Sequence, residues 1–518
     1  MASSATRGRR GRILLLPLLL AGLAGCAPAS GSGGAPGTAP PTGDAESRTT
    51  QYFASLPADS AERLAFLRAM PKGGDLHNHL VGAIYAESWL RWAAADGLCA
   101  DLGNPRIVEP PCDAAHGKPS AASLTTDPVD YGKMVDGMSM RGPAPQPIAG
   151  HDRFFSTFGR FDSNPKRTGD ELAEVAARLA RENTFYVELM LSPGMGEARG
   201  LGKKLKWGGD MAALATQLDQ AGLPALVTRT RADFDQAEAR MRSVLQCGTD
   251  AADPGCKVTI RYLAQVIRTF PPEQVFAQVA LGAELAEADG RIVGLNLVAP
   301  EDDLRTLTDY AEQMRIVGFL TGHGETVAVS LHAGELAPGL VPPEDLAFHI
   351  RQAVEIAGAR RIGHGADIAS ENDAAQLLRE MHDRQILVEV NLTSNDEILG
   401  IKGSTHPLPL YRRYGVPTAF STDDAGVARI DLTHEYQRAA TDFGLGYSDL
   451  KQSARNAVAF SFLAGKRLAD GPDCAAEIGA EQPQSDTCKA FLAANDKARE
   501  QWRLEAAFRH FEATEWPV

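Results

Sequence analysis

Several features that mark common classes of protein are missing from this 518-residue chain. It lacks a basic excess: 66 Asp and Glu outnumber 52 Lys and Arg, for a net charge of −14. Nucleic-acid backbones require basic patches and are therefore not expected partners. The chain has no Cys-x-x-Cys pair to support a thiolate zinc site. It also has no internal repeat, and no Gly-rich phosphate loop follows its first predicted strand.

The amino terminus is typical of a targeting segment, and its apolar run, residues 13–20, is too short to span a bilayer. Four arginines precede this run: Arg7, Arg9, Arg10 and Arg12. Such a basic region followed by a short apolar core indicates export rather than a membrane-spanning helix.

The motif Leu23-Ala24-Gly25-Cys26 resembles the lipobox of bacterial lipoproteins. The resemblance implies a signal peptide over residues 1–25 and a diacylated Cys26, because two acyl chains anchor a protein stably. A plain secretory signal with an incidental cysteine is the alternative, and Arg9-Arg10 leaves twin-arginine export open. We expect an exported chain, lipid-anchored at the outer membrane or cell surface and facing the periplasm or the exterior. Residues 26–50, rich in Ala, Gly, Pro, Ser and Thr, would be its flexible tether.

Six cysteines remain once Cys26 is set aside, and they fall into three pairs that are close in sequence. The pairs are Cys99 and Cys112, Cys247 and Cys256, and Cys474 and Cys488. An even number at short spacings in an exported chain predicts three local disulfides. Six cysteines allow fifteen pairings, so this connectivity is a hypothesis.

Apolar, strand-like runs alternate with helical patterns over most of the chain. The runs lie at residues 73–80, 184–191, 258–267, 291–298, 327–332, 361–363, 386–391 and 417–421. Near-continuous Val, Ile and Leu strands with helical crossovers indicate a parallel sheet, and eight such units predict an α/β fold, the (β/α)8 TIM barrel. A doubly wound open sheet is the structural alternative. We expect this domain over residues 51–518, with an inserted irregular segment after strand 1 at about residues 97–150 and a helical C-terminal extension.

Ionisable residues end or follow four of these strands, which is where barrel enzymes place their catalytic groups. His77 and His79 are two residues apart on the first strand, so their side chains point to the same face. His332 ends the fifth strand and Asp423 follows the eighth. Three imidazoles and one carboxylate suit a borderline cation, and these four residues predict a site for one Zn²⁺ ion.

Three further residues lie next to or near these ligands in the sequence. Glu335, three positions after His332, is placed to act as a general acid toward a substrate nitrogen if burial raises its pKa. His364, at the end of the sixth strand, is placed to orient a water molecule or take its proton. Asp424 is placed to face the substrate while its neighbour holds the metal.

The motifs His-x-His, His-Ala-Gly-Glu, Gly-His-Gly and Ser-x-Asp-Asp, in this order, resemble the adenosine deaminase family of the amidohydrolase superfamily. The likeness covers residues 68–465 with interruptions, and the insertion, the disulfides and the export signal resemble the secreted, growth-factor-type branch. The resemblance implies a zinc-dependent aminohydrolase that converts adenosine or a related 6-aminopurine nucleoside to an inosine-type product and ammonia. It implies that Glu335 protonates purine N1, His364 assists hydroxide attack at C6, and Asp424 hydrogen-bonds N7.

Two positions depart from the family's pattern. Val81 occupies the position of an aspartate that contacts the ribose, and Ala299 that of a glycine whose backbone faces the purine. Phe154, Phe155 and Phe158 lie where the family closes an apolar lid over the nucleoside, with plain helix core as the alternative.

Two other functions stay open. One is a different amidohydrolase acting on another amino-purine, amide or ester, although the fourth strand offers no lysine to bridge two metals. The other is a non-catalytic surface lipoprotein, against which the retention of Glu335, His364 and both aspartates counts. No feature of the sequence predicts an oligomeric state.

Overall fold

The computed structural model describes residues 42–142, 149–161, 165–208, 210–471, 474–478, 480, 482–514 and 516. The signal peptide expected over residues 1–25, the lipidation site Cys26 and the tether up to residue 41 lie outside these ranges. Within the ranges, none of the helices combines the length and the apolar character needed to cross a bilayer.

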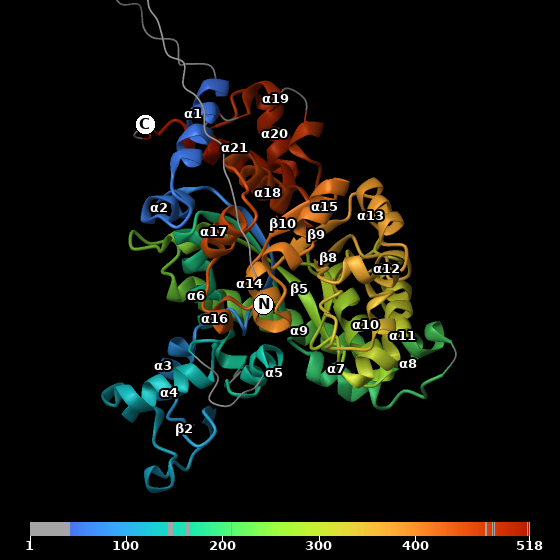
Figure 1. Ribbon diagram of the computed structural model, residues 1–518. Coiled ribbons are helices and arrows are strands. Elements are labelled where there is room, and N and C mark those ends of the chain that lie inside the picture. The colour runs from blue at the N-terminus through green and yellow to red at the C-terminus, as the bar shows by residue number, and fades with distance from the viewer. Residues whose placement is uncertain are drawn as a thin grey trace, which may run out of the picture. The chain divides into compact units, whose positions relative to one another are not determined.

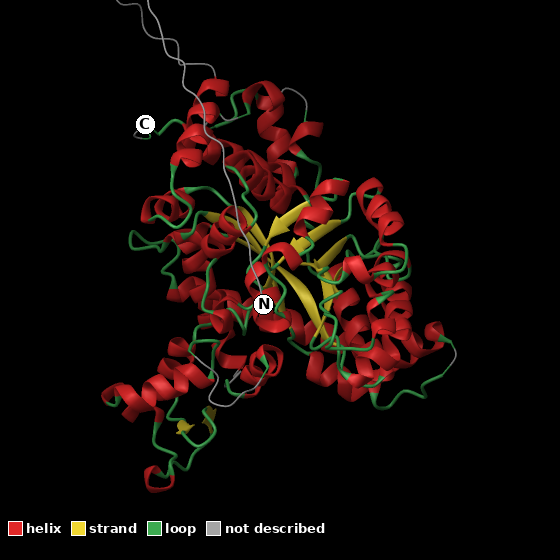
Figure 2. Ribbon diagram, in the orientation of Figure 1, coloured by secondary structure: helices red, strands yellow, loops and turns green. Residues whose placement is uncertain are grey.

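Eight parallel strands form the centre of the fold, and helices surround them (Figures 1 and 2). In chain order the strands are β1 (Gly73–His79), β4 (Thr184–Leu191), β5 (Thr259–Ile267), β6 (Ile292–Val298), β7 (Ser330–Ala333), β8 (Arg361–His364), β9 (Leu387–Val390) and β10 (Thr418–Phe420). They pair as two four-stranded sheets, β1-β4-β5-β6 and β7-β8-β9-β10. Bridges Asn78–Asp423 and Leu295–Val329 join the sheets at both seams. The strands therefore close on themselves, which confirms the predicted barrel and excludes the open doubly wound sheet.

Each strand pair is connected by at least one helix that packs on the outside of the barrel. The crossover helices are α6 (Thr168–Arg181), α10 (Pro272–Ala288), α11 (Leu304–Thr321), α12 (His349–Glu355), α13 (Ala374–Asp383), α14 (Leu392–Leu399) and α15 (Leu408–Tyr414). The eighth strand is followed by α16 (Ala425–Ala428), α17 (Leu432–Asp442) and α18 (Tyr447–Ala459). Strands covered in this way are buried on both faces, which explains why β4 is apolar and buried at nearly every position.

The insertion after the first strand is more regular than the sequence predicts. Helix α3 (Ala86–Ala95) leads into a hairpin of β2 (Cys99–Asp101) and β3 (Arg106–Val108), and α4 (Pro128–Gly137) follows. Trp89 and Met134 are buried in its core. Asp127 caps α4 through the amides of Val129 and Asp130, a local signal that the many Gly and Pro residues obscure.

A second helical excursion, not predicted from the sequence, separates β4 from β5. It consists of α7 (Met195–Gly202), α8 (Met211–Ala221) and α9 (Leu223–Val244). Helix α9 packs on α6 and α10, where Leu226 and Phe234 are buried. The helical pattern there is weak because most of the helix is exposed and polar.

The folded region begins earlier than the sequence predicts. Helix α1 (Thr42–Ser55) starts within the segment expected to be a tether, residues 26–50, and α2 (Ala61–Ala69) follows. The side chain of Tyr52 stacks on Trp516 near the end of the chain, and Glu46 forms an ion pair with Lys451 of α18. These long-range contacts stabilise a segment whose composition alone favours a linker.

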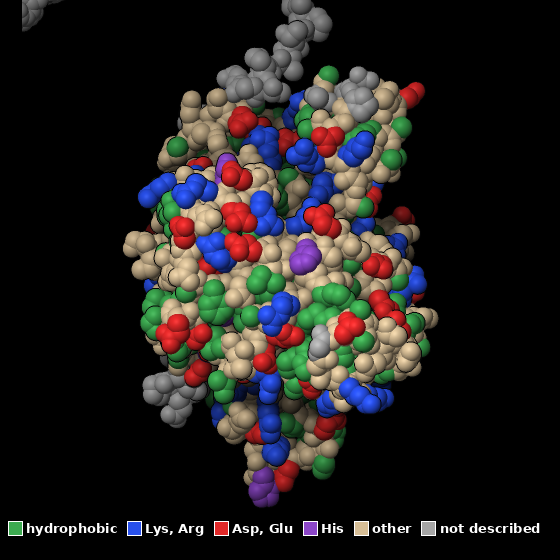
Figure 3. Space-filling view, turned by 90° about the vertical axis from the view of Figure 1, so that its right-hand side faces the viewer, with side chains coloured by type: hydrophobic (Ala, Val, Ile, Leu, Met, Phe, Trp, Pro, Cys, Tyr) green, Lys and Arg blue, Asp and Glu red, His purple; other side chains and the backbone are tan. Residues whose placement is uncertain are grey.

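The C-terminal extension is helical as predicted, with α19 (Cys474–Glu477), α20 (Asp486–Ala494) and α21 (Asp496–Glu512). The predicted disulfides are all present: Cys99–Cys112, Cys247–Cys256 and Cys474–Cys488. On the face of the molecule shown in Figure 3, basic and acidic side chains are interspersed rather than gathered into patches of one sign.

Candidate active site

The seven ionisable residues singled out in the sequence lie together at the carboxyl ends of the barrel strands. Their side chains come from β1, from β7 and the loop after it, from β8 and from the loop after β10, and all seven residues are at most 8% exposed. They are His77, His79, His332, Glu335, His364, Asp423 and Asp424. Packing side chains of this kind in the interior is costly unless they bind one another or a ligand, so the cluster marks a site.

Four donor atoms within this cluster face a common point. His332 Nε2 lies 3.1 Å from His77 Nε2 and 3.2 Å from His79 Nε2. Asp423 Oδ1 lies 3.4 Å from His77 Nε2 and 3.2 Å from His79 Nε2. Ligands bound tetrahedrally at about 2.0–2.1 Å stand about 3.3 Å from one another, so the spacing fits a zinc-sized cation.

The outer nitrogen of each imidazole is held by an oxygen acceptor. His77 Nδ1 donates to Glu389 at 2.7 Å, His79 Nδ1 to Gln265 at 2.7 Å, and His332 Nδ1 to Asn296 at 2.8 Å. The Gln265 amide group is itself oriented, since its nitrogen donates to Ser192 Oγ at 3.2 Å.

An oxygen acceptor at each Nδ1 fixes a proton there and leaves Nε2 as the nitrogen of each ring that faces the common point. Imidazoles held in this way are typical of metal ligands. The donor set of the predicted ligands therefore fits a metal ion on the geometry of this chain. His364 also has a ligand-type atom within 4.8 Å of those of His77, His332 and Asp423.

Two glycines make room for this cluster. A Cβ on Gly363 would lie 2.6 Å from His77 Cε1, and a Cβ on Gly82 would lie 1.6 Å from Asp424 Oδ1. A side chain at either position would displace the neighbouring imidazole or carboxyl group. Gly82 belongs to the loop after His79, so this loop leaves the space that the Asp424 carboxyl group occupies.

Glu335 and His364 lie on the same side of the centre. Glu335 Oε1 is 3.6 Å from His364 Nε2, which is 3.7 Å from Asp423 Oδ2. Burial, reinforced by the charge of Asp423, raises the pKa of Glu335 well above its usual range, which favours the protonated form of its carboxyl group. Burial lowers the pKa of His364 to about 3, so its imidazole is neutral.

Asp424 is a second buried acid whose pKa is raised. Burial and the adjacent Asp423 raise the pKa of Asp424 well above its usual range. Its Oδ1 has no hydrogen-bond partner among the described residues. The raised pKa of Glu335 and of Asp424 favours the protonated form, in which each carboxyl group can donate a hydrogen bond.

The backbone is strained at the same end of the barrel. His364 has φ = 66°, Asp423 has φ = 57° and Ala299 has φ = 82°, all in the left-handed region that favours glycine. Backbone strain of this kind gathers at sites where side-chain placement matters more than stability.

The phenylalanines expected to form a lid belong to α5 (Gly150–Ser156) and the turn after it. Phe154 is buried against Ile398 of α14 and Val427 of α16, both from segments that follow the carboxyl ends of strands. Phe155 packs beside it, whereas Phe158 is 39% exposed. The ring centroids of Phe155 and Phe158 lie 5.5 and 5.8 Å from that of Phe154, so the three form one aromatic cluster, and their role as a lid stays a prediction.

The two positions that depart from the family's pattern also lie at this end. Val81 is partly buried and packs against the main hydrophobic core. The carbonyl of Ala299 accepts a hydrogen bond from Arg268 Nε at 3.0 Å. Neither position supplies a carboxylate.

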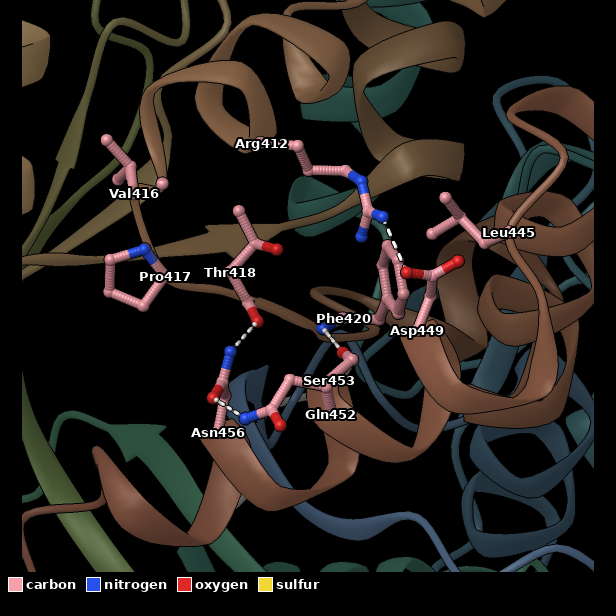
Figure 4. Close-up of a pocket in the computed structure, with 11 residues that line it drawn as sticks. Arg412, Val416, Pro417, Thr418, Phe420, Leu445, Asp449, Gln452, Ser453 and Asn456 are labelled. Atoms are coloured by element: carbon pink, nitrogen blue, oxygen red, sulfur yellow. Dashed lines mark hydrogen bonds and ion pairs between the residues drawn. The ribbon is translucent and has the colours of Figure 1, made fainter. Parts of the chain in front are cut away.

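A cavity of about 370 Å³ lies at the opposite, amino-terminal end of the strands (Figure 4). Its polar side chains are directed at one another and at the backbone. Arg412 pairs with Asp449 at 2.6 Å, Asn456 donates to the carbonyl of Thr418 at 2.9 Å, and Gln452 donates to Asn456 at 2.8 Å. No metal-binding group of His, Cys, Asp or Glu occurs there among the described residues, so this cavity is not the candidate active site.

Sequence reasoning missed the partners of the ligands, namely Gln265, Asn296 and Glu389. Asn296 and Glu389 are polar residues inside strands that are otherwise apolar, and that contrast was the available signal. The signal is weaker for Gln265, because its strand also contains Thr259 and Arg261. Sequence reasoning also assigned no role to Glu301, whose carboxylate accepts hydrogen bonds from the amides of Gly334 and Glu335.

The chain is similar to known proteins in sequence and in structure. Residues 171–470 match the family model described as adenosine deaminase, a range that includes every candidate site residue from His332 to Asp424 but not His77 and His79. The adenosine deaminase of Escherichia coli strain SMS-3-5 is 28% identical over 291 residues, 55% of this chain and 70% of that protein.

Among solved structures, an amidohydrolase from Burkholderia ambifaria with bound zinc superposes with a TM-score of 0.53 at 18% identity, covering 88% of this chain and 97% of that one. An N6-mAMP deaminase from Arabidopsis gives a TM-score of 0.49 at 20% identity, covering 77% and 96% of the two chains. The first of these likenesses supports the barrel fold.

Proposed function

Because the chain belongs to the adenosine deaminase family and is therefore a hydrolytic aminohydrolase, we propose that it replaces the 6-amino group of a purine by oxygen. The proposed substrate is adenosine or a related 6-aminopurine nucleoside, and the products are the inosine-type 6-oxopurine and ammonia. The observation that carries the proposal is the four-donor centre of His77, His79, His332 and Asp423 with two buried carboxyl groups of raised pKa beside it.

The two protonated acids match the acceptors of a purine ring. Purine N1 and N7 are both hydrogen-bond acceptors, and they flank the carbon that carries the amino group. Glu335 is proposed to donate its proton to N1, which makes C6 more electrophilic, and Asp424 to donate a hydrogen bond to N7. An ionised carboxylate could do neither.

The proposed cofactor is one Zn²⁺ per chain, held by His77, His79, His332 and Asp423. When bound, such an ion lowers the pKa of a water molecule so that hydroxide is available near neutral pH. His364, which is neutral, is proposed to accept the proton of the attacking water. Oxygen adds to C6, the C6–N bond breaks, and the amino group leaves as ammonia after gaining a proton.

We also propose that the enzyme works outside the cytoplasm, anchored through a diacylated Cys26. The basic and apolar segment before Cys26 supports this location. Three disulfides support it independently, because such bonds persist in oxidising compartments. Detergent-phase partitioning that is lost on Cys26→Ser is the test; partitioning unchanged by the substitution would refute the anchor.

The experiment that tests the function is an ammonia-release panel with purified, metal-loaded protein lacking residues 1–26. Adenosine, deoxyadenosine, adenine, AMP and an N6-substituted adenosine are compared, before and after treatment with a chelator. We expect ammonia from at least one compound, loss of activity with the chelator, and recovery with Zn²⁺. Release from none of the five compounds would reject the proposal.

The same panel decides how much of the nucleoside is recognised. Val81 leaves no carboxylate where the family contacts the ribose. We therefore expect adenosine and deoxyadenosine to differ less than tenfold in kcat/KM, since a missing hydroxyl discriminates strongly only where a polar partner is left unpaired. Preference for adenine, or for an N6-substituted compound, would instead point to a different amino-purine substrate.

A further inference from the structure

Glu301 lies on a tight turn after β6 that brings it beside the loop carrying Glu335. The turn passes through Ala299, whose φ of 82° reverses the chain, and Pro300. Arg268 steadies it, donating from Nε to the carbonyl of Ala299 at 3.0 Å and from Nη1 to the carbonyl of His332 at 3.2 Å. One buried guanidinium thus links the ends of β6 and β7.

The Glu301 carboxylate accepts hydrogen bonds from two successive amides. The amide of Gly334 donates to Oε1 at 3.1 Å and the amide of Glu335 donates to Oε2 at 2.8 Å. His349 Nδ1 donates to Oε1 at 2.6 Å, and the side chain of Glu301 is fully buried. Burial would raise the pKa of Glu301, but the bond from His349 and the charge of Arg268 outweigh it and lower the pKa, so the group stays ionised.

The loop needs such a partner because it leaves the barrel at this point. Ala333 is the last residue of β7, and Gly334 turns the chain with φ = 71°. The carbonyls of Ala333 and Gly334 accept hydrogen bonds from residues 365–367. The amides of Gly334 and Glu335, on the other side of the same peptides, bond to Glu301.

We infer that Glu301 is a positioning residue that fixes the backbone of Glu335 and thereby the direction of its carboxyl group. Its carboxylate bonds to two amides of the loop and to His349, not to a donor atom of the candidate ligands. The carboxylate is specific to this task because only an ionised carboxylate offers acceptors to two parallel amides; a glutamine would turn its NH₂ group toward one of them. The inference rests on the proposed function for the role of Glu335.

The test is Glu301→Gln in the metal-loaded protein, with Glu371→Gln as the matched control. Glu371 is also buried near this loop and accepts a backbone hydrogen bond, but from Arg351 rather than from the loop. For Glu301→Gln we expect kcat to fall at least ~10-fold, with KM within ~3-fold and metal content unchanged, because a displacement of ~1 Å at a reacting group can cost ~10² in rate. Glu371→Gln should leave kcat within ~3-fold of the unmutated protein.

A second measurement does not depend on activity. Hydrogen exchange of the peptide containing Gly334 and Glu335 should be at least ~10-fold faster in Glu301→Gln and unchanged in Glu371→Gln, because two charge-assisted hydrogen bonds are weakened. Unchanged exchange overturns the inference even if the protein proves not to be a deaminase. If the unmutated protein releases no ammonia but exchange is faster in the variant, the proposed function is rejected. The positioning of the Gly334 and Glu335 amides by Glu301 is then still supported.

A double variant separates positioning from general stability. If Glu301 acts through Glu335, Glu301→Gln should lower kcat less than ~2-fold in a Glu335→Gln background. An equal loss in both backgrounds would show a merely structural role and overturn the inference. If Glu301→Gln does not fold, Glu301→Asp serves in its place, since it keeps the charge beside Arg268 but is too short to reach both amides.

Discussion

Polar side chains line both ends of the barrel, but their hydrogen bonding differs. At the carboxyl end, imidazole nitrogens face one another, the backbone is strained at His364 and Asp423, and buried atoms such as Asp424 Oδ1 and Ser394 Oγ have no partner among the described residues. At the amino end, Arg412, Asp449, Gln452 and Asn456 line a cavity but bond to one another or to the backbone.

The difference shows that a cavity by itself does not mark a functional site. Buried polar atoms are normally satisfied, so a cluster of unsatisfied ones needs a ligand to account for it. Where the polar groups of a cavity are already paired, a small molecule must break those hydrogen bonds to form its own, so little binding free energy is gained. In barrels generally, the amino end contributes to stability and the carboxyl end to chemistry, and the candidate site of this chain lies at the carboxyl end.

The largest effect is expected from the proton donor at the carboxyl end. Glu335→Gln keeps the shape of the side chain but removes the acidic proton, so kcat should fall by ~10²–10⁴. Metal content, measured by atomic absorption, should stay at that of the unmutated protein because Glu335 is not a proposed ligand. A kcat within threefold of the original would eliminate Glu335 as general acid.

A glycine tests how tightly the other acid is placed. Gly82→Ala would put a Cβ 1.6 Å from Asp424 Oδ1, so the carboxyl group must move. Relieving this overlap requires the carboxyl group to shift by ~1 Å or more, and such a shift should lower kcat/KM by ~10². The matched control is Gly196→Ala on α7, where the nearest atom to the new Cβ is 3.9 Å away. Equal activity of the two variants would show that the reaction does not depend on the position of the Asp424 carboxyl group.

The cluster of candidate ligands could be predicted from the sequence because the information is local. His77 and His79 share a face through the two-residue period of a strand, and His332 and Asp423 stand at or just after the ends of apolar runs that reach the same rim. The acceptors that fix the ring tautomers could not be predicted in this way. Gln265 reaches His79, and Asn296 reaches His332, across strands whose register is set by the closed barrel.

The regions mispredicted are those in which distant contacts override local composition. Residues 42–50 have the composition of a linker, yet α1 forms because Tyr52 and Glu46 find partners more than 400 residues away. The insertion at 97–150 is rich in turn-forming residues, yet Cys99 and Cys112 close a hairpin within it. Both segments are therefore structured although their composition is typical of loops.

A Gln→Leu substitution at each end of the barrel tests whether hydrogen bonds to the candidate ligands raise the affinity for Zn²⁺. Gln265→Leu removes the acceptor of His79 Nδ1, and Zn²⁺ affinity should fall ~10–100-fold, as for other groups that orient metal ligands. Gln452→Leu, at the amino-end cavity, removes a hydrogen bond to Asn456 and should leave Zn²⁺ affinity unchanged. Competition with a chromophoric chelator gives both values. Equal affinities would mean that the Gln265 contact does not orient the ligand.

The smallest effect is expected from the ion pair at the amino end. Arg412 and Asp449 are 38% and 37% exposed, so solvent screens their attraction, and Arg412→Ala should lower the free energy of unfolding by less than ~1 kcal/mol. The ammonia-release rate and metal content should not change, because the Arg412–Asp449 pair includes no candidate ligand or catalytic residue. Urea titration of Arg412→Ala, Asp449→Ala and the double variant isolates the pair's own contribution. A tenfold loss of kcat in Arg412→Ala would contradict the separation of the two ends, since it would require the cavity to influence the chemistry through the packed interior of the barrel.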